Sequence, residues 1–442
     1  MNITIAGTGY VGLVTGVCLS DVGHHITCFD INEDKVAMLN SGKSPIYEPG
    51  LEELIKINME KGKLKFTSSP KEAYAGAECI FLAVGTPENE DGSANLTYIE
   101  DAALTISEYI TTDAIIVTKS TVPVGTNERI ERLIKERLPQ SINIKAVSNP
   151  EFLREGTAIH DTFHGDRIVI GSNDEDAGDA VEKIYAPFNI PVVRTDIRSA
   201  EMIKYASNAF LATKISFINE VANLCEATGA NIEHVAEGMG YDKRIGNRFL
   251  QAGVGFGGSC FPKDTKALQH LAAQHDYDFQ MLQVIINVNT EQKNKLFSKA
   301  QSHLGSLEGK RAAVLGLSFK PNTDDIREAP SLELINHLLL ENADVTVFDP
   351  IAMSNVEKLY GNKIEYARSA EMAIEGADVA FIVTEWKEIK EISLNTFKSL
   401  MRTAIIFDGR NCFEIQEAER SGVEYYSIGR RPVLLNSINR IG

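Results

Sequence analysis

The sequence predicts an α/β protein with two doubly wound parallel sheets, one near each end of the chain. Three observations support this prediction. Short apolar runs alternate with helical repeats at both ends, a glycine-rich turn follows the first run, and residues 199–228 contain neither Gly nor Pro. Strands that alternate with helices are typical of parallel sheets, whose ligand sites lie at the carboxyl ends of the strands.

The N-terminal segment predicts a complete βαβ unit with a ligand site. Residues 3–6 are apolar, the turn Gly7-Thr8-Gly9-Tyr10-Val11-Gly12 follows directly, and apolar residues then recur at helical spacing. Residues 25–29 predict a second strand that ends at Asp30. Such a turn lets a pyrophosphate approach the helix N-terminus, while the acid binds ribose hydroxyls and disfavours a 2′-phosphate. We therefore predict NAD as the cofactor; the alternative is a structural turn that binds nothing.

The remaining elements predict three domains. Further strands are expected at 79–84, 114–117 and 145–148, followed by a long central helix over 199–228 that Ser199 would cap. The opening pattern returns in the last third, with strands at 312–315, 345–348, 377–384 and 403–408 and a helix at 331–340. We expect an NAD-binding Rossmann domain at 1–198, a central helical domain at 199–305 and a second Rossmann-like domain at 306–442.

Length and composition restrict the class of protein. The chain has 442 residues, a formal net charge of −17 and 43% hydrophobic residues. This acidity argues against broad nucleic-acid binding, which depends on Lys and Arg. No apolar run approaches the roughly 20 residues that span a bilayer. The six cysteines are scattered without metal-binding spacing, so we expect a reduced, cytoplasmic protein without a metal site or a membrane partner.

A second glycine-rich segment places a cysteine where it can react. Residues 253–258 contain four glycines, Cys260 follows, and a helix is predicted from Pro262. A thiol at a helix N-terminus near Lys263 is a good nucleophile, and Asp264 shares its helix face. This pairing suits an enzyme that forms and hydrolyses an acyl intermediate. The alternative is a buried structural thiol, which we expect for Cys18, Cys28, Cys79, Cys225 and Cys412.

Polar residues elsewhere fit the same pocket. Lys204 and Asn208 are four residues apart in the predicted long helix and share one side of it. Such a pair on a helix is usually solvent-exposed, so alone it predicts little. Thr121, Glu151 and Glu155 follow predicted strands, where they could line a site or cap a helix.

Together these motifs resemble the UDP-glucose 6-dehydrogenases, within the nucleotide-sugar dehydrogenase superfamily. The resemblance covers nearly the whole chain and rests on the opening glycine turn and on residues 120–125, 149–153, 255–264 and 316–320. The cysteine segment is the most specific of these. The resemblance implies two Rossmann-like domains, joined by a long central helix and a helical dimerisation region, with UDP-sugar binding in the C-terminal domain. It also implies NAD-dependent oxidation of UDP-glucose to UDP-glucuronate.

The resemblance assigns roles to individual residues. Cys260 would form a thiohemiacetal and a thioester, Lys204 and Asn208 would stabilise the oxyanion, and Asp264, Thr121 and Glu151 would handle protons and water. Cofactor contacts would come from Gly7, Gly9, Tyr10, Val11, Gly12, Asp30, Lys35, Thr86, Thr121, Glu155, Lys263 and Arg327. Substrate contacts would come from Glu151, Phe152, Leu153, Lys204, Asn208, Arg244, Phe256, Gly257, Cys260, Lys320 and Arg410. Arg244 would reach into a neighbouring subunit, so a homodimer is expected.

Two other hypotheses stand beside this one. The chain could oxidise another nucleotide sugar, such as GDP-mannose or UDP-N-acetylmannosamine. It could also be a non-catalytic NAD-binding protein, because a fold does not fix a function. A binding module, however, would not need Cys260, Asp264, Lys204 and Asn208 together.

Overall fold

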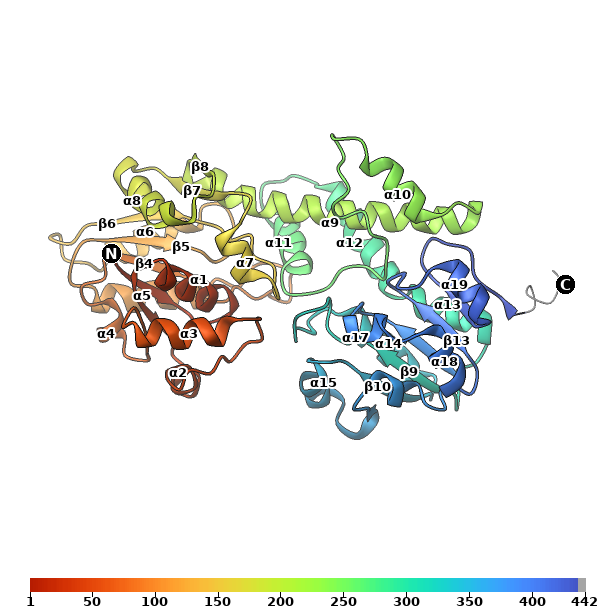
Figure 1. Ribbon diagram of the computed structural model, residues 1–442. Helices are drawn as coiled ribbons and strands as arrows, with labels where there is room; N and C mark the ends of the chain where they lie inside the picture. The colour runs from red at the N-terminus through yellow and green to blue at the C-terminus, as the bar shows by residue number, and fades with distance from the viewer. Residues whose placement is uncertain (436–442) are drawn as a thin grey trace. The chain divides into compact units, whose positions relative to one another are not determined.

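The computed structural model describes residues 1–435, which form two compact units. The first unit contains residues 1–207 and 266–276, and the second contains residues 208–265 and the chain from residue 277 on. Two helices contribute residues to both units: α9 (Ile197–Thr228), a continuous helix of 32 residues, and α11 (Phe261–Gln274) (Figure 1). No helix among residues 1–435 is both long and apolar enough to cross a membrane.

The first unit is built on an eight-stranded sheet in the order β3-β2-β1-β4-β5-β6-β7-β8. Its strands are β1 (Asn2–Ala6), β2 (His25–Phe29), β3 (Leu64–Thr67), β4 (Cys79–Leu82), β5 (Ala114–Thr118), β6 (Ile144–Ser148), β7 (Ile168–Ser172) and β8 (Val192–Thr195). The strand order reverses between β1 and β4, and the carboxyl ends of the two strands at such a reversal are where ligands bind in sheets of this kind. One detail differs from the predicted parallel sheet, because β7 runs antiparallel to β6.

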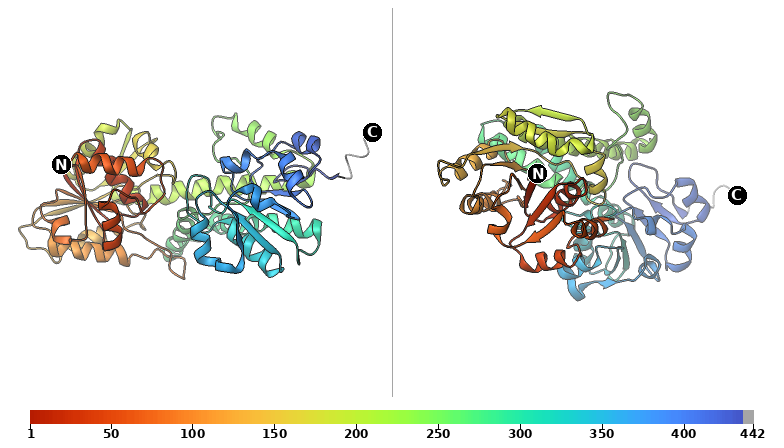
Figure 2. Two further views of the ribbon diagram at one scale, coloured as in Figure 1. Left: turned by 60° about the horizontal axis from the view of Figure 1, so that its bottom comes forward. Right: turned by 60° about the vertical axis from the view of Figure 1, so that its left-hand side comes forward.

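Helices cover both faces of this sheet (Figure 2). They are α1 (Tyr10–Asp21), α2 (Glu33–Asn40), α3 (Leu51–Glu60), α4 (Pro70–Tyr74), α5 (Thr97–Tyr109), α6 (Thr126–Lys135), α7 (Ala158–Phe163) and α8 (Glu175–Tyr185). Successive strand residues point to opposite faces, so Phe81 joins the core under α1 while Leu82 joins the core under α5 and α6. This double coverage explains why the strands are apolar throughout.

The second unit repeats this topology. Its sheet has the order β11-β10-β9-β12-β13-β14, and all its strand pairs are parallel. The strands are β9 (Arg311–Leu315), β10 (Asp344–Phe348), β11 (Glu365–Tyr366), β12 (Val379–Ile382), β13 (Ile405–Asp408) and β14 (Glu424–Tyr426). The helices are α10 (Ile232–Gly240), α12 (Gln280–Lys293), α13 (Lys295–Leu304), α14 (Pro330–Leu340), α15 (Met353–Tyr360), α16 (Ala370–Ile374), α17 (Lys387–Lys390), α18 (Leu394–Leu400) and α19 (Ile415–Ser421). The predicted second doubly wound sheet is therefore present.

The start of the long helix differs from the prediction. Helix α9 begins at Ile197, and the Ser199 backbone N–H donates a 2.8 Å hydrogen bond to Asp196 Oδ1. Asp196 is thus the capping residue, and the prediction that Ser199 caps the helix was wrong. A carboxylate can accept a hydrogen bond from a free N–H of the first turn as well as a hydroxyl can. The capping residue is therefore three positions earlier in the chain than predicted.

Candidate active site

The glycine turn between β1 and α1 leaves room for a ligand at one position. A Cβ on Gly7, whose φ is +97°, would lie 2.8 Å from Ala83 O, and one on Gly12 would lie 2.0 Å from Gly7 O. A Cβ on Gly9 would meet nothing within 4 Å. No side chain caps α1 at Gly9, and its first turn carries no acid. Its free N–H groups, in the first turn where Tyr10 and Val11 lie, therefore suit a pyrophosphate.

Asp30, at the end of β2, is held as an ionised acceptor. Its carboxylate accepts hydrogen bonds from Thr8 N (3.0 Å), Thr8 Oγ1 (2.6 Å) and Asn32 N (3.0 Å), and Lys35 Nζ lies 3.1 Å away. Burial would raise the pKa of Asp30, but these bonds hold it below its usual value. Lys35, expected to contact the cofactor, is here a partner of Asp30.

Two further contacts connect the predicted cofactor residues. The Tyr10 hydroxyl donates to Glu48 Oε2 and accepts a 2.7 Å hydrogen bond from Gly156 N, directly after Glu155. Burial, together with Glu48, raises the pKa of Tyr10, so this hydroxyl stays protonated. Thr86 Oγ1 donates to Thr121 O at 2.9 Å, which joins the loops that follow β4 and β5.

A buried ion pair lies in the same unit. Lys204 Nζ, on α9, is 2.9 Å from Glu151 Oε1, and both side chains are buried. Burial would raise the pKa of Glu151, but the Lys204 ammonium and the 2.6 Å hydrogen bond from Leu153 N hold it low. The Phe152 ring lies 3.5 Å from the Arg167 guanidinium and 5.4 Å from Lys204 Nζ. These contacts bring together Glu151, Phe152, Leu153 and Lys204, which are four of the predicted site residues.

The second unit holds the predicted nucleophile and its acid. Helix α11 begins immediately after Cys260, and Asp264 N donates a 2.8 Å hydrogen bond to Cys260 O. The Asp264 carboxylate is 1% exposed and accepts from Asn208 Nδ2 at 2.6 Å and from Lys263 Nζ at 2.6 Å. Lys263, expected to contact the cofactor, therefore binds Asp264 in this structure.

The cysteines differ in accessibility. Cys18, Cys28, Cys79 and Cys225 are buried, whereas Cys260 is partly exposed. Burial raises the pKa of Cys18 to about 12, and burial also raises the pKa of Cys28 and Cys79. Cys412, which we expected to be buried, is instead partly exposed, although burial and the nearby Asp408 raise the pKa of its thiol. The raised pKa makes Cys18, Cys28, Cys79 and Cys412 poor nucleophiles.

The glycine loop before Cys260 contacts the C-terminal sheet domain. A Cβ on Gly257 would lie 2.3 Å from Glu328 O, and one on Gly258, whose φ is +83°, would lie 2.8 Å from the Phe319 ring. Phe256 N donates to Asn289 Oδ1 at 2.7 Å. A side chain at Gly257 would require the Glu328 backbone to shift, and one at Gly258 would require the Phe319 ring to move. Lys320 Nζ lies 5.4 Å from the Phe319 ring centroid, close to this loop's contact surface.

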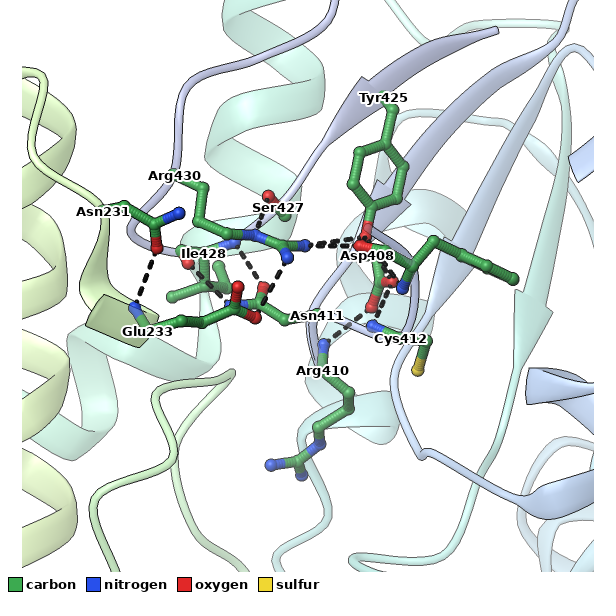
Figure 3. A network of polar contacts seen from close by, with 11 residues as sticks. Asn231, Glu233, Asp408, Arg410, Asn411, Cys412, Tyr425, Ser427, Ile428 and Arg430 are labelled. Carbon is green, nitrogen blue, oxygen red and sulfur yellow. Dashed lines mark hydrogen bonds and ion pairs between the residues drawn. The ribbon is translucent and has the colours of Figure 1, made fainter. Parts of the chain in front are cut away.

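Arg410 is held by a polar network at the end of β13 (Figure 3). The buried Asp408 carboxylate accepts from Arg410 N (2.8 Å), Cys412 N (2.7 Å) and the Tyr425 hydroxyl (2.7 Å). The Arg410 side chain extends away from this network, and its Nε donates to Val383 O at 2.8 Å. The network fixes the backbone and leaves the guanidinium outside it, where Arg410 Nε also lies 3.3 Å from Glu385 Oε2.

Two predicted arginines are mostly exposed. Arg244 forms an ion pair with Asp242, and 88% of its side chain is exposed. Arg327 forms an ion pair with Asp325, while its backbone O accepts a 2.8 Å hydrogen bond from Gly258 N. Within one chain, the Arg244 guanidinium is thus a surface group.

Sequence reasoning missed two buried charged residues beside these clusters. Glu201 accepts from Gly125 N (2.6 Å) and Asn127 N (2.9 Å), which caps α6 and ties it to α9. Lys119, at the end of β5, is buried against Asn149. Glu201 precedes Lys204 by three residues on one helix face, a spacing that could have indicated it. Lys119 had no such signal, because a lysine after a strand usually lies in solvent.

Comparison with known proteins covers nearly the whole chain. Residues 1–189 match the NAD binding domain of the UDP-glucose/GDP-mannose dehydrogenase family, 198–291 its central domain and 313–415 its UDP binding domain. The UDP-glucose 6-dehydrogenase YwqF of Bacillus subtilis (strain 168) is 55% identical over 434 residues, which cover 98% of this chain and 99% of that protein.

Solved structures agree. A UDP-glucose dehydrogenase from the hyperthermophilic archaeon Pyrobaculum islandicum has a TM-score of 0.91 at 37% identity, with 97% of this chain and 98% of that chain covered. A UDP-D-ManNAc dehydrogenase from Pyrococcus horikoshii has a TM-score of 0.86 at 28% identity, with 97% and 99% covered. These matches confirm the resemblance that the glycine turn and the cysteine segment predicted. The chain belongs to the UDP-glucose/GDP-mannose dehydrogenase family.

Proposed function

We propose that this chain oxidises UDP-glucose to UDP-glucuronate, with two NAD⁺ reduced and one water consumed per sugar. The full-length similarity to a UDP-glucose 6-dehydrogenase at 55% identity carries this assignment. We assign NAD binding to residues 1–198, the cysteine loop to a central domain at 199–305, and UDP-sugar binding to 306–442.

The N-terminal residues fit NAD. The open position at Gly9 and the uncapped start of α1 would receive the pyrophosphate, and the ionised Asp30 would accept hydrogen bonds from the ribose hydroxyls. The bound nicotinamide supplies a hydride acceptor. Lys35, Thr86, Thr121 and Glu155 are the further cofactor contacts in this proposal, with Lys263 and Arg327 as additional ones.

Cys260 carries the covalent chemistry in this proposal. Its Sγ adds to C6 of the aldehyde that the first oxidation produces, and the carbonyl oxygen becomes the oxyanion of a thiohemiacetal. The C6 hydrogen then leaves with its electron pair to the second NAD⁺, which gives a thioester. Water adds at C6, the C–S bond breaks, and the thiol and the product carboxylate are released.

Buried polar groups support these steps. Lys204 and Asn208 stabilise the oxyanion at C6, because buried donors act strongly on developing charge. Asp264, already an acceptor for Asn208 and Lys263, takes the proton of the hydrolytic water, with Thr121 and Glu151 assisting proton transfer.

Substrate recognition is shared among the remaining predicted residues. Lys320 and Arg410 supply positive charge for the UDP diphosphate, and arginine can bind phosphate with two parallel N–H groups. Contacts to the rest of the substrate are assigned to Phe152, Leu153, Phe256 and Gly257.

We also propose a homodimer in a reducing compartment. Helix α9 exposes Phe210 (66%), Phe217 (53%) and Leu224 (62%) at seven-residue spacing, which places them on one face of the helix. A second copy of the chain would cover this stripe and receive the exposed Arg244. A catalytic thiol has to stay reduced, which the cytoplasm ensures.

The experiment that tests the activity measures NADH formation with UDP-glucose, GDP-mannose, UDP-N-acetylmannosamine and UDP-N-acetylglucosamine. We expect UDP-glucose to be preferred, with two NADH per UDP-glucuronate. A preference for an N-acetylated sugar would instead favour the activity named for the Pyrococcus horikoshii structure. NAD binding without turnover of any of the four would contradict the proposal.

A further inference from the structure

Lys119 is a buried ammonium whose direct hydrogen-bond partners are neutral. Its Nζ donates to Asn149 Oδ1 at 3.1 Å and to the Tyr185 hydroxyl at 3.2 Å, and it lies 5.3 Å from the Tyr185 ring centroid. The Tyr185 hydroxyl itself donates to Asn149 Oδ1 at 2.6 Å. Lys119 is 8% exposed, and no carboxylate forms an ion pair with it in the described part of the chain. Burial of a charge without a counter-ion costs several kcal/mol.

The charged groups that interact electrostatically with Lys119 are Glu151 and Lys204, and its hydrogen-bond partner Asn149 lies two residues before Glu151 in the chain. Burial lowers the pKa of Lys119 to about 8, while Glu151 opposes this shift and Lys204 adds to it. Lys119 in turn helps to hold the pKa of Glu151 low. Tyr185 stays neutral because burial raises its pKa. Two ammonium groups therefore accompany one carboxylate, and the cluster carries a surplus positive charge at neutral pH.

A surplus positive charge of this kind can stabilise negative charge that develops on a bound substrate. Lys204 Nζ forms an ion pair with Glu151 Oε1 at 2.9 Å. The carboxylate therefore cancels much of the electrostatic field that Lys204 would exert on a substrate. A second cation close to the pair offsets the carboxylate. Electrostatic stabilisation acts most strongly in such a buried, preorganised cluster, and perturbed ionisation next to a polar cluster is typical of functional sites.

We propose that Lys119 is a positioning residue of the oxidation, whose ammonium acts through the Glu151–Lys204 pair to strengthen the field on the oxyanion at C6. This inference rests on the role of Lys204 in the proposed function. Lys119 does not touch the sugar in this account. Its positive charge acts on the Glu151–Lys204 pair, which does touch the sugar in the proposed function. Lys119 also orients Asn149, which follows β6.

The kinetic test compares Lys119→Met with Lys119→Arg across pH 6.5 to 9.5. At pH 7 we expect Lys119→Met to lower kcat by about tenfold or more, because one nearby unit charge shifts an ionic transition state by at least this much. The ratio of wild-type to variant kcat should approach one above pH 9, where Lys119 itself is neutral. Lys119→Arg should keep much of the activity and lose the alkaline decrease, since arginine stays charged.

Lys135→Met is the matched control. This substitution removes the same charge at an exposed position of α6, where Lys135 forms an ion pair with Glu131. Its kcat ratio to wild type should be close to one at every pH. A Lys119→Met ratio that is constant across the pH range would show a structural role and overturn the inference, as would an unchanged kcat.

Thermal unfolding provides a readout that does not depend on turnover. The folded pKa of Lys119 lies below its unfolded value, so the unfolded chain binds the extra proton between about pH 8 and 10.5 and stability rises with pH there. We expect Lys119→Met to melt higher than wild type at pH 7 and the difference to narrow by pH 9.5. Wild type could fail to oxidise UDP-glucose while the difference in melting temperature still narrows with pH. That result would contradict the proposed function but would support a buried, charged Lys119. A difference that does not change with pH would contradict the inference.

Discussion

The Asn208 amide donates a 2.6 Å hydrogen bond to Asp264 Oδ2, which joins α9 to α11 one helical turn after Cys260. Both side chains are almost fully buried. The bond fixes the orientation of the Asn208 amide and leaves Asp264 with Lys263 as its other partner. The donor and the acceptor to which the proposed function assigns two different steps are thereby held in one arrangement.

Asn208→Ala should lower kcat by about 10²–10³-fold, because loss of one preorganised oxyanion donor has this effect. The KM for NAD should change little. Steady-state NADH formation measures both quantities. Asn287→Ala, on the exposed face of α12, is the control and should behave like wild type. A selective rise of the KM for NAD in Asn208→Ala would place this residue at the cofactor instead.

The Glu151–Lys204 pair should make stability depend on acid pH. The folded pKa of Glu151 lies below its unfolded value of 4.5, so the pair's contribution is complete above that pH and is lost as pH falls through the folded value. Lys204→Met should cost about 3–5 kcal/mol at pH 7, since it removes the ion-pair partner of a buried carboxylate. Denaturant unfolding at pH 3 to 7 measures this, with Glu136→Gln as an exposed control. Equal stability of Lys204→Met and wild type at pH 7 would contradict the buried pair.

Asp30 should control the choice between NAD and NADP. Asp30→Ala removes an ionised acceptor and leaves Lys35 unpaired beside the ribose position. Loss of bonds to a charged group costs roughly 1.5–3 kcal/mol, so NAD affinity should fall about tenfold or more while the relative affinity for NADP rises. Fluorescence titration with both cofactors measures this, with the exposed Asp34→Ala as control. Unchanged discrimination would remove Asp30 from the ribose site.

Arg244 should act in the partner subunit. Chains with Arg244→Ala and chains with Cys260→Ala should each be inactive alone. In co-expressed mixed dimers, the first chain supplies the thiol and the second the arginine for one site, so roughly a quarter of wild-type activity should return. Lys243→Ala, next to Arg244, should be active alone. Failure of the mixture to regain activity would show that Arg244 serves its own chain or none.

Much of the architecture could be predicted from local patterns. The βαβ start, the long helix and the second doubly wound sheet follow from apolar periodicity and glycine turns, and the structure confirms them. The antiparallel direction of β7 was not predictable. The apolar pattern of Ile168–Ser172 does not depend on strand direction, which is determined by pairing with neighbouring strands. Ser199 and Asp196 both offer capping oxygens, and tertiary context selects Asp196.

The chemistry of the site was predictable to a different extent. Cys260, Asp264 and the glycine turn stand out by spacing alone, and the family match covers the segments in which they lie. The partners of these residues were not visible in sequence. Lys204 and Asn208 have the pattern of a solvent-exposed pair, yet each is buried against an acid from a distant segment. The burial of Lys119 beside Asn149 arises only on folding and has no signal in the sequence.

The covalent role of Cys260 is tested most directly by trapping. Asp264→Asn should leave the thiol able to react but slow the hydrolysis, so the thioester should accumulate when UDP-glucose and NAD⁺ are added. Rapid acid quench followed by peptide mass spectrometry should find the UDP-glucuronyl adduct on Cys260, and the double variant with Cys260→Ala should show none. Substantial UDP-glucuronate formation by Cys260→Ala, with no adduct on the cysteine peptide of Asp264→Asn, would contradict the account.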